Sequence, residues 1–80
     1  MKLPRDLDAD VLVRALVRIG YRQTRQVGSH VRLTLSEDPE HHVTIPRHSP
    51  LRVGTLAAVL DDVAGRLGVD RATLLGRLFG

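Results

Sequence analysis

His30 and Arg32 stand two residues apart, and side chains of these types at this spacing can do chemistry on a phosphodiester. Histidine gains and loses a proton near neutral pH, so His30 is a candidate base for the proton of a ribose 2′-hydroxyl. The arginine guanidinium stays charged and can stabilise the negative charge that develops on the phosphorane. His48 is the candidate acid for the 5′-oxygen leaving group. RNA brings its own nucleophile, so this scheme requires neither a metal ion nor another cofactor.

The same residues have explanations that involve no catalysis. An exposed histidine on a strand is usually only a surface residue, and Arg32 taken alone is an ordinary solvated charge. His41 and His42 are a weak metal site, because adjacent residues of a strand point to opposite faces. The chain has no cysteine, which excludes a thiolate zinc site, a thiol nucleophile and a disulfide framework. We therefore predict no metal site.

Positive charge is concentrated in the middle of the chain. The 80 residues carry 12 lysines and arginines, nine acidic residues and a formal charge of +3. Between residues 14 and 52, seven arginines stand against three acidic residues. This imbalance favours a polyanionic partner, most simply RNA. Tyr21 and Phe79 are the sole aromatic residues, which argues against a stacking platform for single strands. Besides Arg32, the arginines that we predict to contact RNA are Arg14, Arg18, Arg22, Arg25, Arg47 and Arg52.

Three segments have the residue spacing of amphipathic helices. The first is predicted over residues 8–20, the second follows a loop over residues 47–54, and the third is a short helix near the C-terminus. Aspartate and threonine cap helix N-termini, and glycine in a left-handed conformation ends helices. The residues that we expect to begin or end these helices are Asp8, Gly20, Thr55, Gly65 or Gly68, and Asp70.

Three strands are predicted between the first two helices, over residues 21–27, 30–35 and 41–46. Gly28 and Ser29 fit the two central positions of a type II′ hairpin turn, with glycine first. A polar turn over residues 36–40 leads to the third strand. If Leu35 pairs with His41 across that turn, all the apolar residues of both strands fall on one face of the sheet.

This register places His30 opposite Pro46, with His30 and Arg32 about 7 Å apart along one strand on the polar face. His42 is then roughly 13 Å from His30, too far to share one phosphate. His48 follows Pro46 at the end of the sheet where His30 lies. We therefore predict one α+β domain over residues 1–80. It has a three-stranded antiparallel sheet, with helices on one face and an open polar face.

The composition favours the cytoplasm. A secreted domain of this size would usually need disulfides, and the chain has no cysteine. No stretch approaches the roughly 20 apolar residues of a membrane span. The N-terminal residues contain no apolar run of the kind found in signal peptides. We expect a cytoplasmic protein that does not bind membranes.

Several short motifs follow one another in a specific order between Lys2 and Leu60. They are a Leu-Pro start, a helix that ends in Gly-Tyr, a Gly-Ser-His hairpin, a His-Val-Thr-Ile-Pro strand, and then a histidine and Gly-Thr-Leu. In this order the sequence resembles the HicA (YcfA-like) toxin family. The resemblance implies a double-stranded-RNA-binding-like α-β-β-β-α fold. It also implies an mRNA interferase that stops translation and is neutralised by a HicB antitoxin.

The resemblance assigns the catalytic role to His30, with Gly28 and Ser29 forming the family turn. It also implies a complex with the antitoxin, and we expect the free toxin to be a monomer. Two features depart from the family pattern. Ala57 and Ala58 stand where basic residues often follow Gly-Thr-Leu, and the second helix carries an acidic pair at residues 61–62. Both weaken the case for RNA contact by the second helix.

Three functions are compatible with the sequence. The first is an endoribonuclease toxin, which the family motifs, the basic centre and the His30–Arg32 pair favour. The second is a non-catalytic module that binds double-stranded RNA, which shares the fold and charge but needs no histidine. The third is an interaction module whose polar face docks a protein. Cleavage that depends on His30 distinguishes the first, and RNA binding at low salt separates the second from the third.

Overall fold

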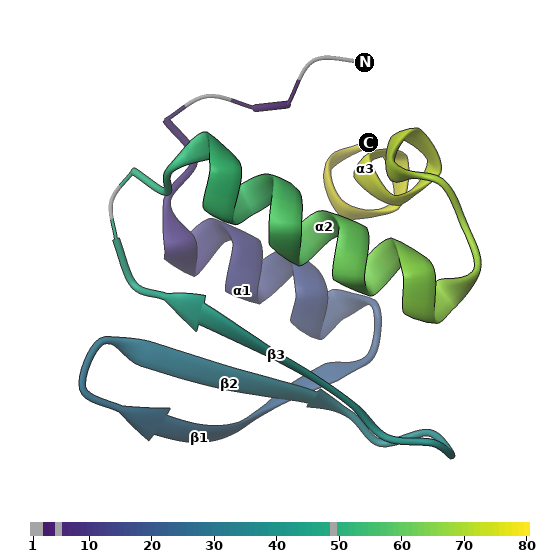
Figure 1. The fold of residues 1–80 in the computed structure, drawn as a ribbon, viewed down its shortest axis with the longest axis horizontal. Coiled ribbons are helices and arrows are strands. Elements are labelled where there is room, and N and C mark those ends of the chain that lie inside the picture. The colour runs from purple at the N-terminus through teal and green to yellow at the C-terminus, as the bar shows by residue number, and fades with distance from the viewer. Residues whose placement is uncertain (1–2, 5, 49) are drawn as a thin grey trace.

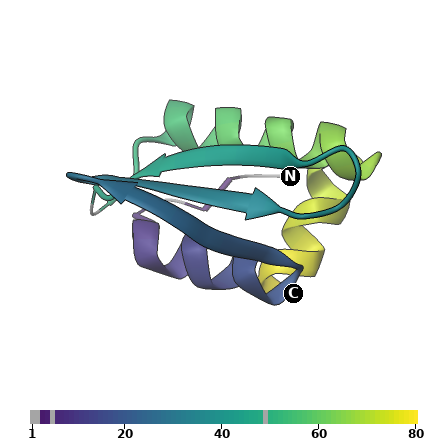
Figure 2. The ribbon, with the colours of Figure 1, turned by 90° about the horizontal axis from the view of Figure 1, so that it is seen from below.

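The computed structural model describes residues 3–4, 6–48 and 50–80, and it confirms the predicted order α-β-β-β-α-α. The three helices lie on one face of a three-stranded antiparallel sheet and leave the other face open (Figures 1 and 2). This arrangement is the predicted α+β class. The elements are α1 (Ala9–Arg18), β1 (Tyr21–Val27), β2 (His30–Leu35), β3 (His41–Pro46), α2 (Val53–Leu67) and α3 (Arg71–Phe79).

The sheet has the strand order β1-β2-β3, so β2 is central. The predicted register of β2 and β3 is confirmed, with Leu35 opposite His41 and His30 opposite Pro46. This register sends the apolar side chains of β2 and β3 toward the helices. The buried core residues of the two strands are Val31, Leu33, Leu35, Val43 and Ile45.

A β-bulge interrupts the pairing of β1 with β2, and the sequence did not predict it. Gln23 faces Leu33 and Arg25 faces Arg32, so Thr24 is the extra residue. The bulge reconciles two demands on the register. The two-residue turn fixes the pairs near Val27, whereas Tyr21 has to enter the core opposite Leu35 at the other end. One extra residue between these points reverses which side chains of β1 face the helices and which face the open side of the sheet.

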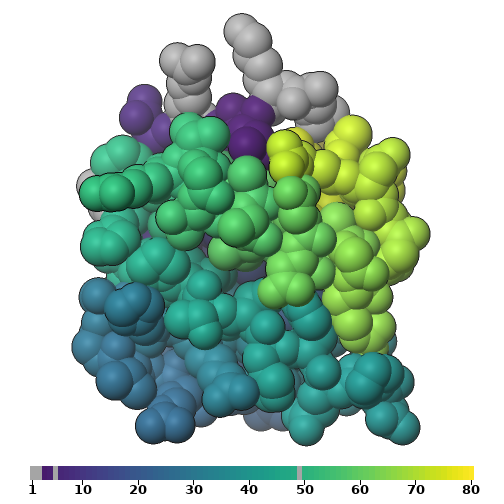
Figure 3. All heavy atoms as spheres, viewed as in Figure 1, coloured from purple at the N-terminus to yellow at the C-terminus, as the bar shows by residue number. Residues whose placement is uncertain are grey.

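The helices cover the apolar face of the sheet. α1 and α2 pack on the strands, and α3 packs against both of these helices. In the space-filling view, α2 and α3 form the upper part of the surface and the strands form the lower part (Figure 3). A bidentate pair joins α2 to α3, since Arg71 donates to both carboxylate oxygens of Asp61 at 2.9 and 2.7 Å. This contact lowers the pKa of Asp61. In the described part of the chain, no helix is both long and apolar enough to cross a membrane.

The first predicted helix start is confirmed in position, and the second needs correction. Asp8 occupies the N-cap position of α1 but makes no capping hydrogen bond with its side chain. α2 begins at Val53 with Arg52 as its N-cap, so Thr55 lies inside the first turn. The reason lies before the helix: Leu51 is buried, and its N–H donates to the carbonyl of Leu7. This tertiary contact fixes the chain and lets the helix begin two residues before the predicted cap.

The other helix boundaries are set by local signals. The carboxylate of Asp70 accepts a hydrogen bond from the N–H of Thr73 at 2.7 Å, which confirms the predicted cap of α3. Gly68 ends α2 in a left-handed conformation. α1 ends at Arg18, before the predicted residue 20, and Gly20 then turns the chain into β1 with a φ of +119°.

We expect Gly20→Ala to destabilise the protein by about 1–3 kcal/mol, because L residues avoid this φ. The new Cβ would also lie 3.2 Å from Cδ1 of Leu35. Gly65→Ala is the matched control. Gly65 lies within α2 with open space around it, so alanine there should stabilise by about 0.5–1 kcal/mol. Urea unfolding followed by circular dichroism measures both changes. A Gly20→Ala midpoint equal to that of the wild type would contradict the assigned strain.

Candidate active site

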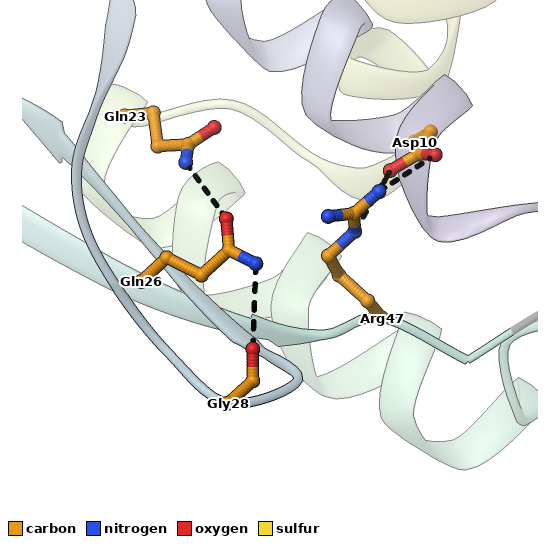
Figure 4. Close-up of polar contacts among 5 residues, drawn as sticks. All are labelled: Asp10, Gln23, Gln26, Gly28 and Arg47. Carbon is orange, nitrogen blue, oxygen red and sulfur yellow. Dashed lines mark hydrogen bonds and ion pairs between the residues drawn. The ribbon is translucent and has the colours of Figure 1, made fainter.

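The hairpin turn that precedes β2 fixes the position of His30. Gly28 has a φ of +57°, whereas Ser29 is not in the positive-φ region, which is the sign pattern of a type II′ turn. The turn is supported on both sides. The side chain of Gln26 donates to the carbonyl of Gly28 at 3.3 Å (Figure 4). The N–H of Arg47 donates to the carbonyl of Ser29 at 2.6 Å. The backbone at the start of β2 is therefore well defined.

His30 lies exposed at the turn end of the open face. Within the residues that the structure describes, its ring makes no hydrogen bond, ion pair or ring contact. Arg32 follows on the same face and is partly buried between its strand neighbours. These neighbours are Arg25 on β1 and Thr44 on β3. The structure thus brings together the imidazole and guanidinium that the sequence paired, and the bulge adds a second guanidinium beside them.

The open face is positively charged and has no internal counter-charge. β1, β2 and β3 contain no aspartate or glutamate. Arg22, Arg25 and Arg32 make no ion pair or hydrogen bond through their side chains in the part of the chain that is described. Like charges directly opposite each other on neighbouring strands are destabilising, as for Arg25 and Arg32. An anion bound to this face would relieve that repulsion, and a phosphate group matches the guanidinium geometry.

The far end of the open face carries a chain of polar side chains. The hydroxyls of Thr24 and Thr34 are 2.8 Å apart, and the hydroxyl of Thr34 is 2.8 Å from Nδ1 of His42. Thr34 is buried by these contacts although it belongs to the open face. His42 is thus held in place four residues along the sheet from the level of His30, roughly 13 Å away. It lies outside the His30 site, as predicted.

His41 points the other way, as predicted for neighbouring strand residues, and it connects the sheet to α2. The hydroxyl of Tyr21 lies 2.7 Å from Nδ1 of His41, and Nε2 of His41 lies 2.9 Å from Oδ1 of Asp62. A neutral imidazole protonated at Nε2 satisfies both contacts. Burial, assisted by the charge of Asp62, raises the pKa of Tyr21 to about 12. No local pattern in the sequence predicts this series of contacts, because its members lie on β1, β3 and α2.

No metal site is formed by the part of the chain that the structure describes. Among those residues, no group of three histidine, aspartate or glutamate side chains is placed to hold an ion.

His48 lies just past the end of β3, where its N–H donates to the carbonyl of Pro46 at 2.8 Å. Its side chain is exposed and helps to line a shallow pocket of about 120 Å³ at the start of α1. The other lining residues are Asp8, Ala9, Asp10 and Arg47, and His30 is not among them. His48 is therefore at the correct end of the sheet but beside α1. Its role as the acid stays a prediction.

The six arginines predicted to contact RNA separate into three locations. Arg22 and Arg25 lie on the open face with Arg32. Arg47 forms a bidentate pair with Asp10 of α1 at 3.1 and 3.2 Å (Figure 4), and Arg52 is exposed at the start of α2. The remaining two, Arg14 and Arg18, line a groove between α1 and α3, on the helical side of the molecule.

Comparison with known proteins identifies a family of toxins. A family model described as HicA toxin of bacterial toxin-antitoxin matches residues 9–64 of the 80-residue chain. The matched span contains α1, the whole sheet and most of α2, whereas α3 lies beyond it. No curated protein matches the chain, and no solved structure does.

We expect the phenol of Tyr21 to titrate near pH 12 in the folded protein and near its ordinary value of 10.0 in urea. Between these values the unfolded chain loses a proton that the folded chain keeps, so stability falls as pH rises. The sequence has one tyrosine and no tryptophan, so tyrosinate absorbance reports on this residue alone. Asp62→Asn should lower the folded midpoint in part, because burial is the larger cause. A folded midpoint near 10 would contradict the assignment, provided that circular dichroism shows a folded protein.

Proposed function

The chain belongs to the HicA toxin family, and from this membership we propose that it is an endoribonuclease toxin that cleaves mRNA with His30 as its base. The observation that carries the proposal is the placement of His30. Its ring is exposed and has no partner among the described residues, and it stands beside Arg32 on a face whose strands contain no acidic residue. A phosphodiester laid on this face meets positive charge and a proton acceptor together.

The proposed reaction is an internal transesterification of RNA. The imidazole of His30 takes the proton of a 2′-hydroxyl, and the 2′-oxygen attacks the adjacent phosphorus. The bond from phosphorus to the 5′-oxygen breaks as the new bond forms, which leaves a 2′,3′-cyclic phosphate. Arg32 stabilises the charge of the phosphorane, because its guanidinium stays protonated throughout.

The 5′-oxygen needs a proton as it leaves, and His48 is the proposed donor. It lies at the same end of the sheet as His30, one residue beyond the pairing of Arg47 with Ser29. His42 is a poorer donor, because it lies at the opposite end of the open face from His30. Its contact with the hydroxyl of Thr34 keeps it there.

Substrate binding is assigned to Arg22 and Arg25 together with Arg32. These side chains form a row across β1 and β2 that has no carboxylate partner in the described part of the chain. Contacts of this kind bind the sugar–phosphate backbone without reading its sequence. We therefore propose that the polyanion bound by this row is RNA, and that the target of cleavage is mRNA in the cytoplasm.

Toxins of this family pair with an antitoxin, and we propose a HicB-like protein as the partner of this one. A partner that covers His30 and the arginine row blocks both catalysis and binding at once. Its contact surface would carry acidic groups to match the open face. The free toxin is proposed to be a monomer that forms a hetero-oligomer with this antitoxin.

We expect His30→Ala to reduce RNA cleavage about 10²–10⁴-fold, the usual contribution of a general acid or base. His42→Ala is the matched control, since it removes a histidine from the far end of the same face and should leave most of the activity. A substrate with a single 2′-deoxynucleotide at the cleaved position should resist the wild type. Equal cleavage by wild type and His30→Ala would exclude His30 as the catalyst. RNA binding without any cut product would favour the non-catalytic binding module.

We expect Arg25→Ala to weaken RNA binding. The slope of the logarithm of the RNA association constant against the logarithm of salt concentration should fall by about one, which corresponds to one lost phosphate contact. Arg52→Ala is the control, because Arg52 is exposed at the start of α2 and not on the sheet. Binding of an uncleavable 2′-deoxy-substituted oligonucleotide at several salt concentrations measures both. Equal salt-dependence slopes for Arg25→Ala and the wild type would mean that RNA does not contact Arg25.

A further inference from the structure

A groove of about 580 Å³ runs between α1 and α3, on the helical side of the molecule. Figure 2 shows the C-terminal end of α3 beside the C-terminal half of α1. Three arginines line the groove, Arg14 and Arg18 from α1 and Arg77 from α3. Arg14 and Arg18 are among the arginines predicted to contact RNA, but the sheet separates them from the open face that carries His30.

All the charged side chains that line the groove are positive. No aspartate or glutamate is among the residues that line it. Arg18 donates a hydrogen bond to the carbonyl of Leu78 in the last turn of α3, so its position is fixed by the fold. Arg14 and Arg77 make no hydrogen bond or ion pair through their side chains in the described part of the chain. Three guanidinium groups around one hollow repel one another, and an anionic occupant would be stabilised by all three.

The groove is also apolar in part. Val11 and Leu78 contribute to its wall, and Phe79 is 40% exposed beside them. An occupant that complements this surface carries both carboxylates and an apolar side chain. Arginines next to an exposed aromatic ring are common at protein interfaces, because both residue types are enriched there.

We propose that this groove docks an acidic segment of a partner protein, with an apolar side chain of that segment against Phe79. The inference does not rest on RNA cleavage, because the groove and the open face share no residue. One wall of the groove is α3, which lies outside the span that the family model matches. The groove therefore combines α1, which lies inside the matched span, with α3, which lies beyond it.

The test uses a synthetic peptide in which glutamate and aspartate alternate with leucine. It is titrated into the isotope-labelled full chain, and backbone amide shifts are followed by NMR. We expect shifts in α1 and α3 and none in the strands. The peptide with glutamine and asparagine in place of the acids should bind at least about tenfold more weakly, because hydrogen bonds to charged groups are worth about 1.5–3 kcal/mol.

Arg14→Ala with Arg77→Ala should weaken binding of the acidic peptide by at least about tenfold. Arg22→Ala with Arg25→Ala is the matched control, since it removes two exposed arginines from the sheet and should leave peptide binding unchanged. Both double variants keep Arg18 and its contact with Leu78. Circular dichroism confirms that each is folded before the titration.

Four outcomes would overturn the proposal. Shifts confined to the strands would mean that the acidic peptide only mimics RNA on the open face. Equal binding of the neutral peptide would remove the role of the arginines. Shifts of the α1 and α3 amides on addition of an RNA oligonucleotide would assign the groove to RNA. Concentration-dependent broadening of these amides without peptide would mean that a second copy of the chain occupies the groove.

Discussion

Successive side chains of a β-strand point to opposite faces, and the structure depends on how β2 obeys this constraint. Its even-numbered positions His30, Arg32 and Thr34 lie on the open face, whereas its odd-numbered positions lie in the core. Sliding β2 by one residue would bury an imidazole and a guanidinium and expose three aliphatic side chains. The hydrophobic core therefore fixes the register, and the register in turn places His30 in solvent. The stability of the domain and the geometry of the proposed site come from the same alternation.

Charge is distributed so that the two sides of the molecule have separate positive surfaces. On the open face, the bulge at Thr24 sets Arg25 opposite Arg32, and no strand residue neutralises them. On the helical side, arginines from α1 and α3 surround a groove with an apolar wall. The first surface includes an exposed imidazole that has no partner among the described residues, which suits a phosphodiester. The second is concave and partly apolar, which suits a protein segment. The two surfaces thus suit two different kinds of anion.

The acidic pair at residues 61–62 of α2 has a structural use in this chain. Asp61 binds Arg71 at the start of α3, and Asp62 accepts a hydrogen bond from His41 on β3. The first contact helps to fix α3 against α2, and the second ties the sheet to α2. These residues stabilise the helical layer and leave the open face without acidic groups. α3, which lies beyond the span that the family model matches, is on the side of the molecule away from His30.

The sequence by itself determined the order of the elements, the hairpin at Gly28 and the pairing of β2 with β3. Each of these depends on local signals, namely alternation with a period of two, glycine at a turn and short connections. His30 was placed on the open face for the same reason. Only the tertiary structure decided the bulge at Thr24, the start of α2 and the division of the arginines between two surfaces. These features follow from contacts between segments far apart in the chain, which no local pattern encodes. Examples are the hydrogen bond from Leu51 to Leu7 and the hydrogen bonds that join Tyr21 through His41 to Asp62 of α2.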